Sequence, residues 1–126
     1  MSKELTKKDI AKLSLTTATK KRDWARLPGF LSFGDTYKLP PKLIKKGWFE
    51  YGKHLRKEKD YVEAVLAFNS ARRFDIYDPE IIPFICQCFS EFYELFSPIF
   101  SREDLVIFKD AVDRFVDFYR VKKGKE

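Results

Sequence analysis

Apolar residues recur every three or four positions through the last two-thirds of the chain, and this spacing predicts helices. The clearest stripe is Leu105, Phe108, Val112, Phe115 and Tyr119, whose 3,4,3,4 spacing places these side chains on one helical face that we expect to be buried. Periodicity and capping residues together predict four main helices, at about 41–57, 61–75, 80–96 and 102–121.

The start of the third helix has two interpretations. Asp78, Pro79 and Glu80 are typical of an N-cap, a first-turn proline and an early acid, which favours a start at Pro79. Pro83 would then lose a backbone hydrogen bond to the first turn. In the other interpretation, regular helical geometry begins at Pro83.

The first third of the chain has a different pattern. Thr6 and Asp9 resemble a capping box, so we expect a short helix at about 6–14 and irregular chain beyond it. Residues 28–41, PGFLSFGDTYKLPP, contain proline and glycine at spacings that favour extended or turn-rich chain. This segment is also rich in apolar side chains, namely Phe30, Leu31, Phe33 and Tyr37. We therefore expect it to pack on the helical body or on a partner, with an aromatic side chain as the anchor.

Residues 48–71 resemble a tetratricopeptide repeat (TPR), which has Trp, Leu-Gly and Tyr on a first helix and Ala, an aromatic residue and Ala on a second. The matching positions are Trp48, Gly52, Ala64, Phe68 and Ala71, while Tyr51 replaces the usual leucine and Leu55 the usual tyrosine. Such a pattern reflects close antiparallel packing. We expect Gly52 and Ala64 to face each other, because a larger side chain would push the two helices apart.

The resemblance extends loosely to residues 80–121, which resemble a second, degenerate repeat. It implies an all-α fold of TPR-like helical hairpins, with a concave face lined by the first helix of each hairpin. On that face the resemblance places four candidate partner-binding residues: Phe49, Lys53, Arg56 and Gln87. The chain is then divided into a basic, partly irregular N-terminal arm (1–41), a TPR-like helical domain (42–121) and a basic tail (122–126).

Charge is distributed unevenly along the chain. The net charge is +6, but residues 1–47 hold 12 Lys and Arg against 4 Asp and Glu, so the N-terminal third carries all the positive excess. Within it, Lys20, Lys21 and Arg22 precede Trp24, a combination that can bind nucleic acid through phosphate contacts and base stacking. The structural alternative is a solvated basic arm whose tryptophan docks on the body.

Several classes of function are disfavoured. No apolar stretch approaches the ~20 residues of a membrane span, and the two cysteines, Cys86 and Cys88, suggest neither a disulfide framework nor a metal site. The single histidine, His54, has no nucleophile or acid in view and is expected to be exposed. We therefore expect no catalytic residues, no cofactor, no metal and a cytoplasmic location.

The sequence predicts a non-enzymatic protein–protein interaction module, such as an adaptor, a small chaperone or a subunit of a larger assembly. The expected partner is an acidic or amphipathic protein segment. Because stacked repeats usually need about three copies to cover their apolar faces, a second copy of the chain is another candidate partner. The alternative function is a nucleic-acid- or ribosome-associated protein that contacts RNA or DNA through the basic arm.

Overall fold

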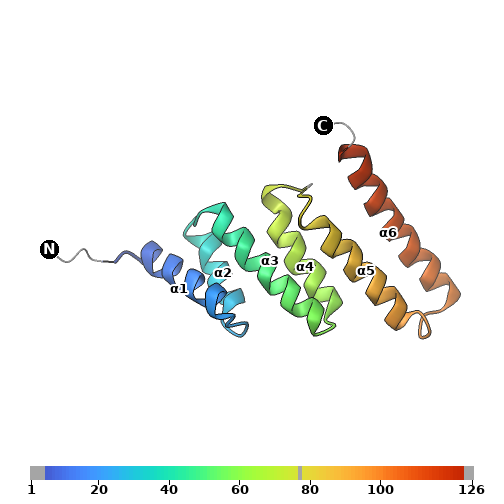
Figure 1. Ribbon diagram of the computed structural model, residues 1–126, viewed down its shortest axis with the longest axis horizontal. Helices are drawn as coiled ribbons and strands as arrows, with labels where there is room; N and C mark the ends of the chain where they lie inside the picture. The colour runs from blue at the N-terminus through green and yellow to red at the C-terminus, as the bar shows by residue number, and fades with distance from the viewer. Residues whose placement is uncertain (1–4, 77, 124–126) are drawn as a thin grey trace.

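The computed structural model describes residues 5–76 and 78–123, and within them it has helices and no strand, which confirms the all-α part of the predicted fold (Figure 1). Its elements are α1 (Lys7–Lys21), α2 (Leu27–Thr36), α3 (Pro41–Lys57), α4 (Tyr61–Ala71), the 3-10 turn η1 (Arg72–Phe74), α5 (Ile82–Phe96) and α6 (Arg102–Lys123). Residues 124–126 of the predicted tail lie outside the described residues, as do the side chains of Phe115 and Tyr119.

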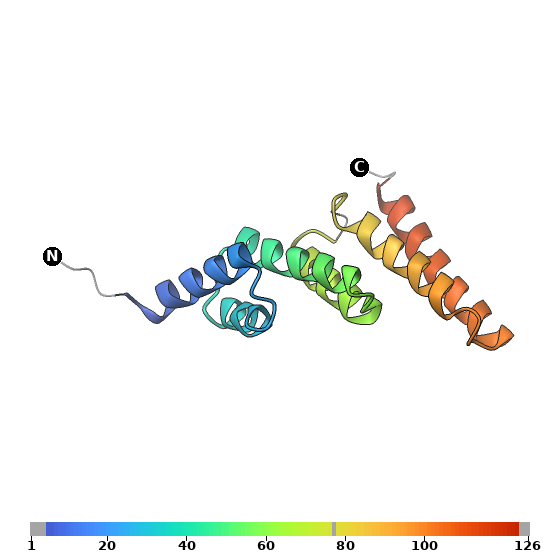
Figure 2. The same cartoon turned by 60° about the horizontal axis from the view of Figure 1, so that its bottom comes forward.

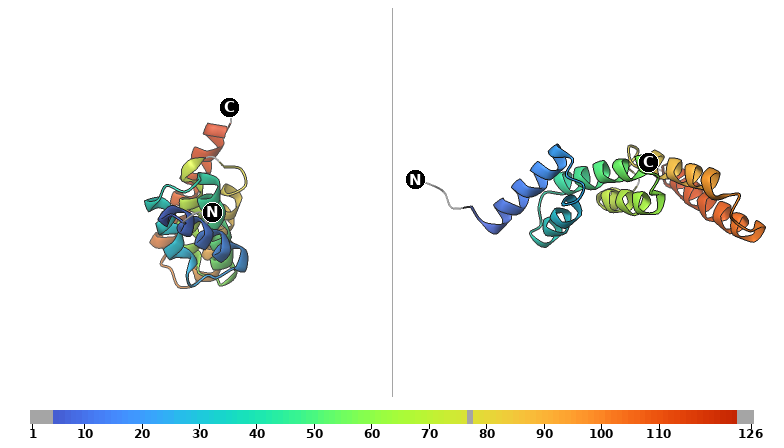
Figure 3. Two further views of the ribbon diagram at one scale, coloured as in Figure 1. Left: turned by 90° about the vertical axis from the view of Figure 1, so that its left-hand side faces the viewer. Right: turned by 90° about the horizontal axis from the view of Figure 1, so that it is seen from below.

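The helices lie side by side in a row, with α1 and α6 at its two ends (Figures 1 and 2). Consecutive helices are neighbours, and the most extensive contact joins α3 to α4. α3 also touches both α1 and α2, so it connects the first part of the row to the second. The row bends along its length and stays open, and the outer sides of α1 and α6 therefore have no helix of the described chain against them (Figure 3).

The N-terminal third is more regular than the sequence pattern predicts. α1 continues to Lys21, and residues 27–36 form α2 in place of irregular chain. Thr16 and Thr19 fit into α1 because each hydroxyl donates a hydrogen bond to the carbonyl oxygen four residues earlier. Pro28 stands in the first turn of α2, where a missing N–H leaves no helical hydrogen bond unmade.

This N-terminal pair of helices packs on α3 through aliphatic side chains. The most deeply buried members of the contact are Leu15, Leu27, Leu31, Leu39 and Ile44, each at most 3% exposed. The expected aromatic anchors are peripheral, because Phe30 and Tyr37 are half-buried at its edge and Phe33 is exposed. An ion pair between Arg73 and Asp35 ties the end of α2 to η1.

Two glycines allow α3 to approach its neighbours on both sides. A Cβ on Gly47 would lie 2.8 Å from the Cδ2 of Leu31, and a Cβ on Gly52 would lie 2.7 Å from two ring carbons of Phe68. Real Cβ atoms do not come this close to other carbons, so a larger residue at either position would force the Leu31 or Phe68 side chain to shift. The three heavy atoms nearest to a Cβ on Gly52 all belong to the Phe68 ring, and Ala64 is buried in the same core.

α5 begins at Ile82, so the later of the two predicted starts, near Pro83, is correct. Asp78 lies just before it and is 4% exposed. Its carboxylate is paired with Lys45 of α3 and accepts a hydrogen bond of 2.9 Å from the Glu80 N–H. Burial alone would raise the pKa of Asp78, but these donors outweigh it and the pKa is lowered from its usual value. The hydrogen bond to Asp78 in turn raises the pKa of Lys45.

The close contact between Gly52 of α3 and α4 predicts that two glycine-to-alanine substitutions have opposite effects on stability. Gly52→Ala should destabilise the fold by about 1–3 kcal/mol, because the added methyl group would force the fully buried Phe68 ring to shift. Gly29→Ala is the matched control, since a Cβ there meets nothing within 4 Å and alanine favours the helix by about 0.5–1 kcal/mol. Thermal melts compare the two variants. A Gly52→Ala protein as stable as wild type would contradict the contact.

The Asp78–Lys45 pair predicts a pH-dependent stability. Because the folded pKa of Asp78 is below its unfolded value, ionised Asp78 stabilises the fold above about pH 4 and loses this effect as the pH falls through the folded pKa. Asp78→Asn should therefore lower the free energy of unfolding at pH 7 by about 1.5–3 kcal/mol. Urea titrations should show the difference in the free energy of unfolding between the variant and wild type narrowing as the pH falls below about 4. An unchanged difference would contradict the assignment.

Candidate functional site

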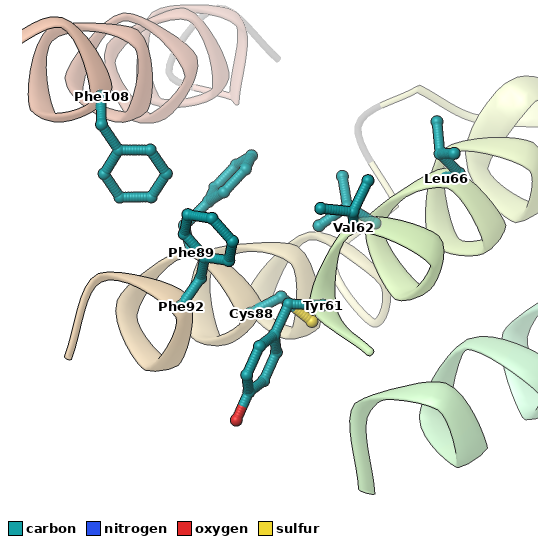
Figure 4. A pocket seen from close by; sticks show the side chains of 8 residues that line it. Tyr61, Val62, Leu66, Cys88, Phe89, Phe92 and Phe108 are labelled. Carbon is teal, nitrogen blue, oxygen red and sulfur yellow. The ribbon is translucent and has the colours of Figure 1, made fainter. Parts of the chain in front are cut away.

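An apolar groove lies where α4, α5 and α6 meet (Figure 4). It holds about 180 Å³ and is open to solvent on one side. Its lining consists of Tyr61, Val62, Val65, Leu66, Cys88, Phe89, Phe92 and Phe108. Among these side chains no polar atom is exposed to the groove. The chemistry of the groove is therefore purely that of apolar contact.

Each wall of the groove comes from a different helix. α4 contributes Val62 and Leu66, which are one turn apart and are 60% and 54% exposed. On the opposite side, the ring of Phe108 projects from α6 towards α5 (Figure 4). It packs 5.3 Å from the ring centroid of Phe92 and 6.2 Å from that of Phe89. These rings hold α6 to α5, and the space beside α4 stays open.

A polar network holds α3, α4 and α5 together at one end of the groove. The hydroxyl of Tyr61 points away from the groove, while its ring forms part of the lining (Figure 4). Arg56 of α3 donates a hydrogen bond to the Glu91 carboxylate of α5, and this contact raises the pKa of Arg56. Burial, with nearby Glu91, raises the pKa of Tyr61. Tyr61 therefore stays neutral at pH 7.

The predicted partner-binding residues do not form one exposed surface. Phe49 is 7% exposed and packs between Phe68 and Phe84, with ring centroids 5.8 and 5.2 Å away, so it is a core residue. In this structure the Phe49 side chain fills space between α3 and α5, and contact of Phe49 with a partner stays a prediction. Lys53 lies over the Phe49 ring and pairs with Glu50 at 2.9 Å.

The remaining two candidates differ in their surroundings. Arg56 is engaged with Glu91 and lies over the Phe84 ring, whereas Gln87 is exposed on α5. Nothing in these contacts singles out either residue as a ligand-binding group. We therefore take the groove beside α4, and not the surface of α3, as the candidate site.

The basic cluster before Trp24 is exposed, but the tryptophan is not. Lys20, Lys21 and Arg22 end α1 and project into solvent. Trp24 is half-buried and stacks on the imidazole of His54, with ring centroids 4.5 Å apart and planes 13° from parallel. The same stacking makes His54 half-buried, in contrast to its predicted exposure. Trp24 docks on α3, which corresponds to the structural alternative raised by the sequence.

The groove residues were missed because α4 is apolar on more than one side. Its buried face contains Ala64, Phe68 and Ala71, as the resemblance to a repeat implies. Val62 and Leu66 form a second apolar edge that the repeat pattern does not require. A helix that is apolar beyond one face packs on additional surface or presents it to a partner, and this was the available signal.

Other kinds of site are not found in the described part of the chain. Over residues 5–76 and 78–123, no three His, Cys, Asp or Glu side chains are grouped so as to hold a metal ion. No helix in the same residues has both the length and the apolar character needed to cross a membrane. No protein-family model matches the chain, and no curated protein or solved structure is significantly similar to it.

The difference in burial between the two cysteine thiols predicts that they react at different rates. Cys88 lines the groove but is 0% exposed, and burial raises its pKa to about 11. Cys86 is half-buried on another side of α5. We expect a maleimide at pH 7 to label Cys86 in the folded protein and to label Cys88 only in denaturant, because only an exposed thiolate reacts. Mass spectrometry of the digested protein measures this, and equal labelling in the folded state would contradict the packing.

Proposed function

We propose that this chain is a non-enzymatic protein–protein interaction module, acting as an adaptor, a small chaperone or a subunit of a larger assembly. The observation that supports it most directly is the groove between α4, α5 and α6, whose lining side chains expose no polar atom. Apolar surface of this kind is costly to leave in water and is typical of protein-binding sites.

The chemistry of the groove favours a helical ligand. An extended peptide carries backbone N–H and C=O groups that must find partners when they leave water. The groove side chains offer none. A helix satisfies its own backbone and presents only side chains, so the proposed ligand is an amphipathic helix whose apolar face enters the groove. Val62 and Leu66 on α4 and Phe108 on α6 are the proposed contact residues.

We also propose that the helices are arranged as TPR-like hairpins. α1 begins at Lys7 and α3 at Pro41, 34 residues later, which equals the length of a TPR. The α3–α4 pair has the close contact at Gly52 that the repeat pattern requires. Under this proposal α1–α2, which the sequence pattern left as an arm, is a further helical pair that covers one side of α3.

Photo-cross-linking tests the proposed function. A photoreactive amino acid replaces Leu66 in one protein and Ile76 in the matched control, since Ile76 is also exposed but lies outside the groove. Both proteins are irradiated in cells of the source organism, and cross-linked peptides are identified by mass spectrometry. The proposal expects an amphipathic helical segment of a protein at Leu66 and not at Ile76. Equal products at both positions, or products removed by nuclease, would overturn it.

The same partner then gives a quantitative prediction. Leu66→Asp places an unpaired charge in an apolar site and should weaken binding by about 2 kcal/mol or more, roughly 30-fold. Ile76→Asp should leave the dissociation constant within about twofold, as expected of a position outside the contact. Titration calorimetry measures both, and circular dichroism confirms that each variant is folded. Salt should change the affinity little, because the groove contact is apolar.

A further inference from the structure

Positive charge is concentrated in two of the helices. α1 and α3 together hold eleven Lys and Arg against two acidic residues, Asp9 and Glu50, a net charge of +9. By contrast, α2, α4 and α5 contain no Lys or Arg, and the whole chain has a net charge of +6. α1 and α3 lie on one side of the row and α2 and α4 on the other, so the charge is segregated in space as well as in sequence (Figures 2 and 3).

The lysines of α3 form a stripe along the side that faces neither α2 nor α4. Gly47 and Gly52 mark the contacts with those two helices. The helical repeat of 3.6 residues places on the remaining side Lys42, Lys46, Lys53 and Lys57. Three of these lysines are exposed, and the side chain of Lys53 is 33% exposed. From Lys42 to Lys57 the stripe is about 22 Å long.

α1 extends this basic surface. Lys8 and Lys12 lie on the same side of α1 as Thr19. The hydroxyl oxygen of Thr19 is 3.5 Å from the position that a Cβ on Gly47 would occupy, so this side of α1 adjoins α3. Both lysines are exposed. We call these two residues and the four lysines of the α3 stripe the lysine face.

Few carboxylates oppose the lysine face. Glu50 lies on the α3 stripe and pairs with Lys53, while the carboxylate of Asp9 caps the start of α1. The acidic side chains that border the stripe gather around Lys45, which pairs with one of them: Asp75, Asp78 and Glu80. Over residues 5–76 and 78–123, no carboxylate is ion-paired with the other five lysines of the face. These five charges are therefore available to a ligand.

A surface of lysines favours a polyanion over a protein segment. Exposed ion pairs each contribute little, and a protein ligand gains most of its affinity from apolar anchors in desolvated pockets. The aromatic side chains of α3 are buried or half-buried, namely Trp48, Phe49 and Tyr51. The exposed part of the stripe thus consists of charged side chains. Nucleic acid can bind such a surface through its phosphates alone, because each contact releases condensed counterions.

The same feature favours a duplex over a single strand. Proteins that bind single strands stack the bases on aromatic side chains. Trp24, in the basic N-terminal region, is itself stacked on His54. The bases of a duplex are already stacked, and its phosphates can be contacted without any reading of the bases.

We propose that the lysine face binds the phosphate backbone of a nucleic-acid duplex, DNA or RNA, independently of base sequence. Lys42 and Lys46 are at its centre, between the lysines of α1 and the C-terminal half of α3. The contact uses neither Val62 nor Leu66 and is thus independent of the groove.

Fluorescence anisotropy with labelled duplexes of about 20 base pairs tests the proposal. DNA and RNA duplexes are titrated separately with the full chain at about 50 and about 200 mM salt, and the tighter complex identifies the natural class of ligand. About four phosphate contacts predict that this rise in salt weakens binding roughly 100-fold. Two duplexes of unrelated sequence should bind equally within about threefold, because the lysines contact only phosphates.

Paired substitutions locate the contact. Lys42→Ala combined with Lys46→Ala should weaken binding at the lower salt roughly tenfold or more, and should lower the slope of log affinity against log salt by about two. Arg102→Ala combined with Lys109→Ala is the matched control, because it removes the same charge from exposed positions on α6. The control should keep the affinity within about threefold. Circular dichroism confirms that each variant is folded.

An acidic peptide separates nucleic acid from an acidic protein as the ligand. A peptide of about 20 residues, in which every second residue is glutamate, should bind much more weakly than the duplex at the same salt concentration. A peptide that binds as tightly would assign the face to an acidic protein segment, and a single strand that binds more tightly would exclude a duplex. Either result, no binding of any duplex at the lower salt, or an equal loss of affinity in the α6 control would overturn the proposal.

Discussion

The close approach of α3 to the helices on both of its sides is the constraint on which the rest of the structure depends. Gly47 lies against Leu31 of α2 and Gly52 against the Phe68 ring of α4, each so closely that a methyl group would force the neighbouring side chain to shift. These two contacts lie on different sides of one helix, so α3 joins two hydrophobic cores that otherwise share few residues. Trp48, between the glycines, packs against both cores. The position of α3 therefore determines how the N-terminal pair of helices lies relative to α4 and α5.

In a row of helices held by such pairwise contacts, apolar side chains in the middle are well buried and those at the ends are poorly buried. Phe68, Ile81 and Ile85 are fully buried because helices flank them on several sides. At the α6 end, Val106 and Ile107 remain exposed because the row stops there, and beside α4 the groove remains open because α6 packs on α5 through a few aromatic rings. The exposed apolar surface is therefore a consequence of the architecture, and it is concentrated where a helix from another molecule would complete the packing.

Local sequence signals predicted the central helices well because they report on faces that are buried within one helical pair. The helix predicted at about 41–57, the capping box at Thr6 and the proline near the start of α5 all correspond to observed features. The failures have a common physical origin in tertiary contacts. Pro28 and Gly29 resemble a turn locally, yet the burial of Leu27 and Leu31 against α3 stabilises a helix there. Phe49 was a candidate partner-binding residue. A repeat pattern does not reveal its burial, because this burial depends on α5, which brings Phe84 against it. The groove could not be predicted from local patterns for the same reason. It brings together Leu66 and Phe108, which are 42 residues apart in the sequence.

The groove and the two ends of the row both expose apolar side chains, but they differ in the polar groups around those side chains. The groove side chains expose no polar atom, so a ligand there gains affinity from apolar burial, which salt scarcely weakens. At the ends of the row, exposed aliphatic side chains lie beside charged residues of both signs, such as Lys21 and Asp23 at one end and Arg102 and Glu103 at the other. Leu66 lines the groove and Ile107 lines a separate hollow on α6, so a ligand bound in the groove leaves the end of the row uncovered.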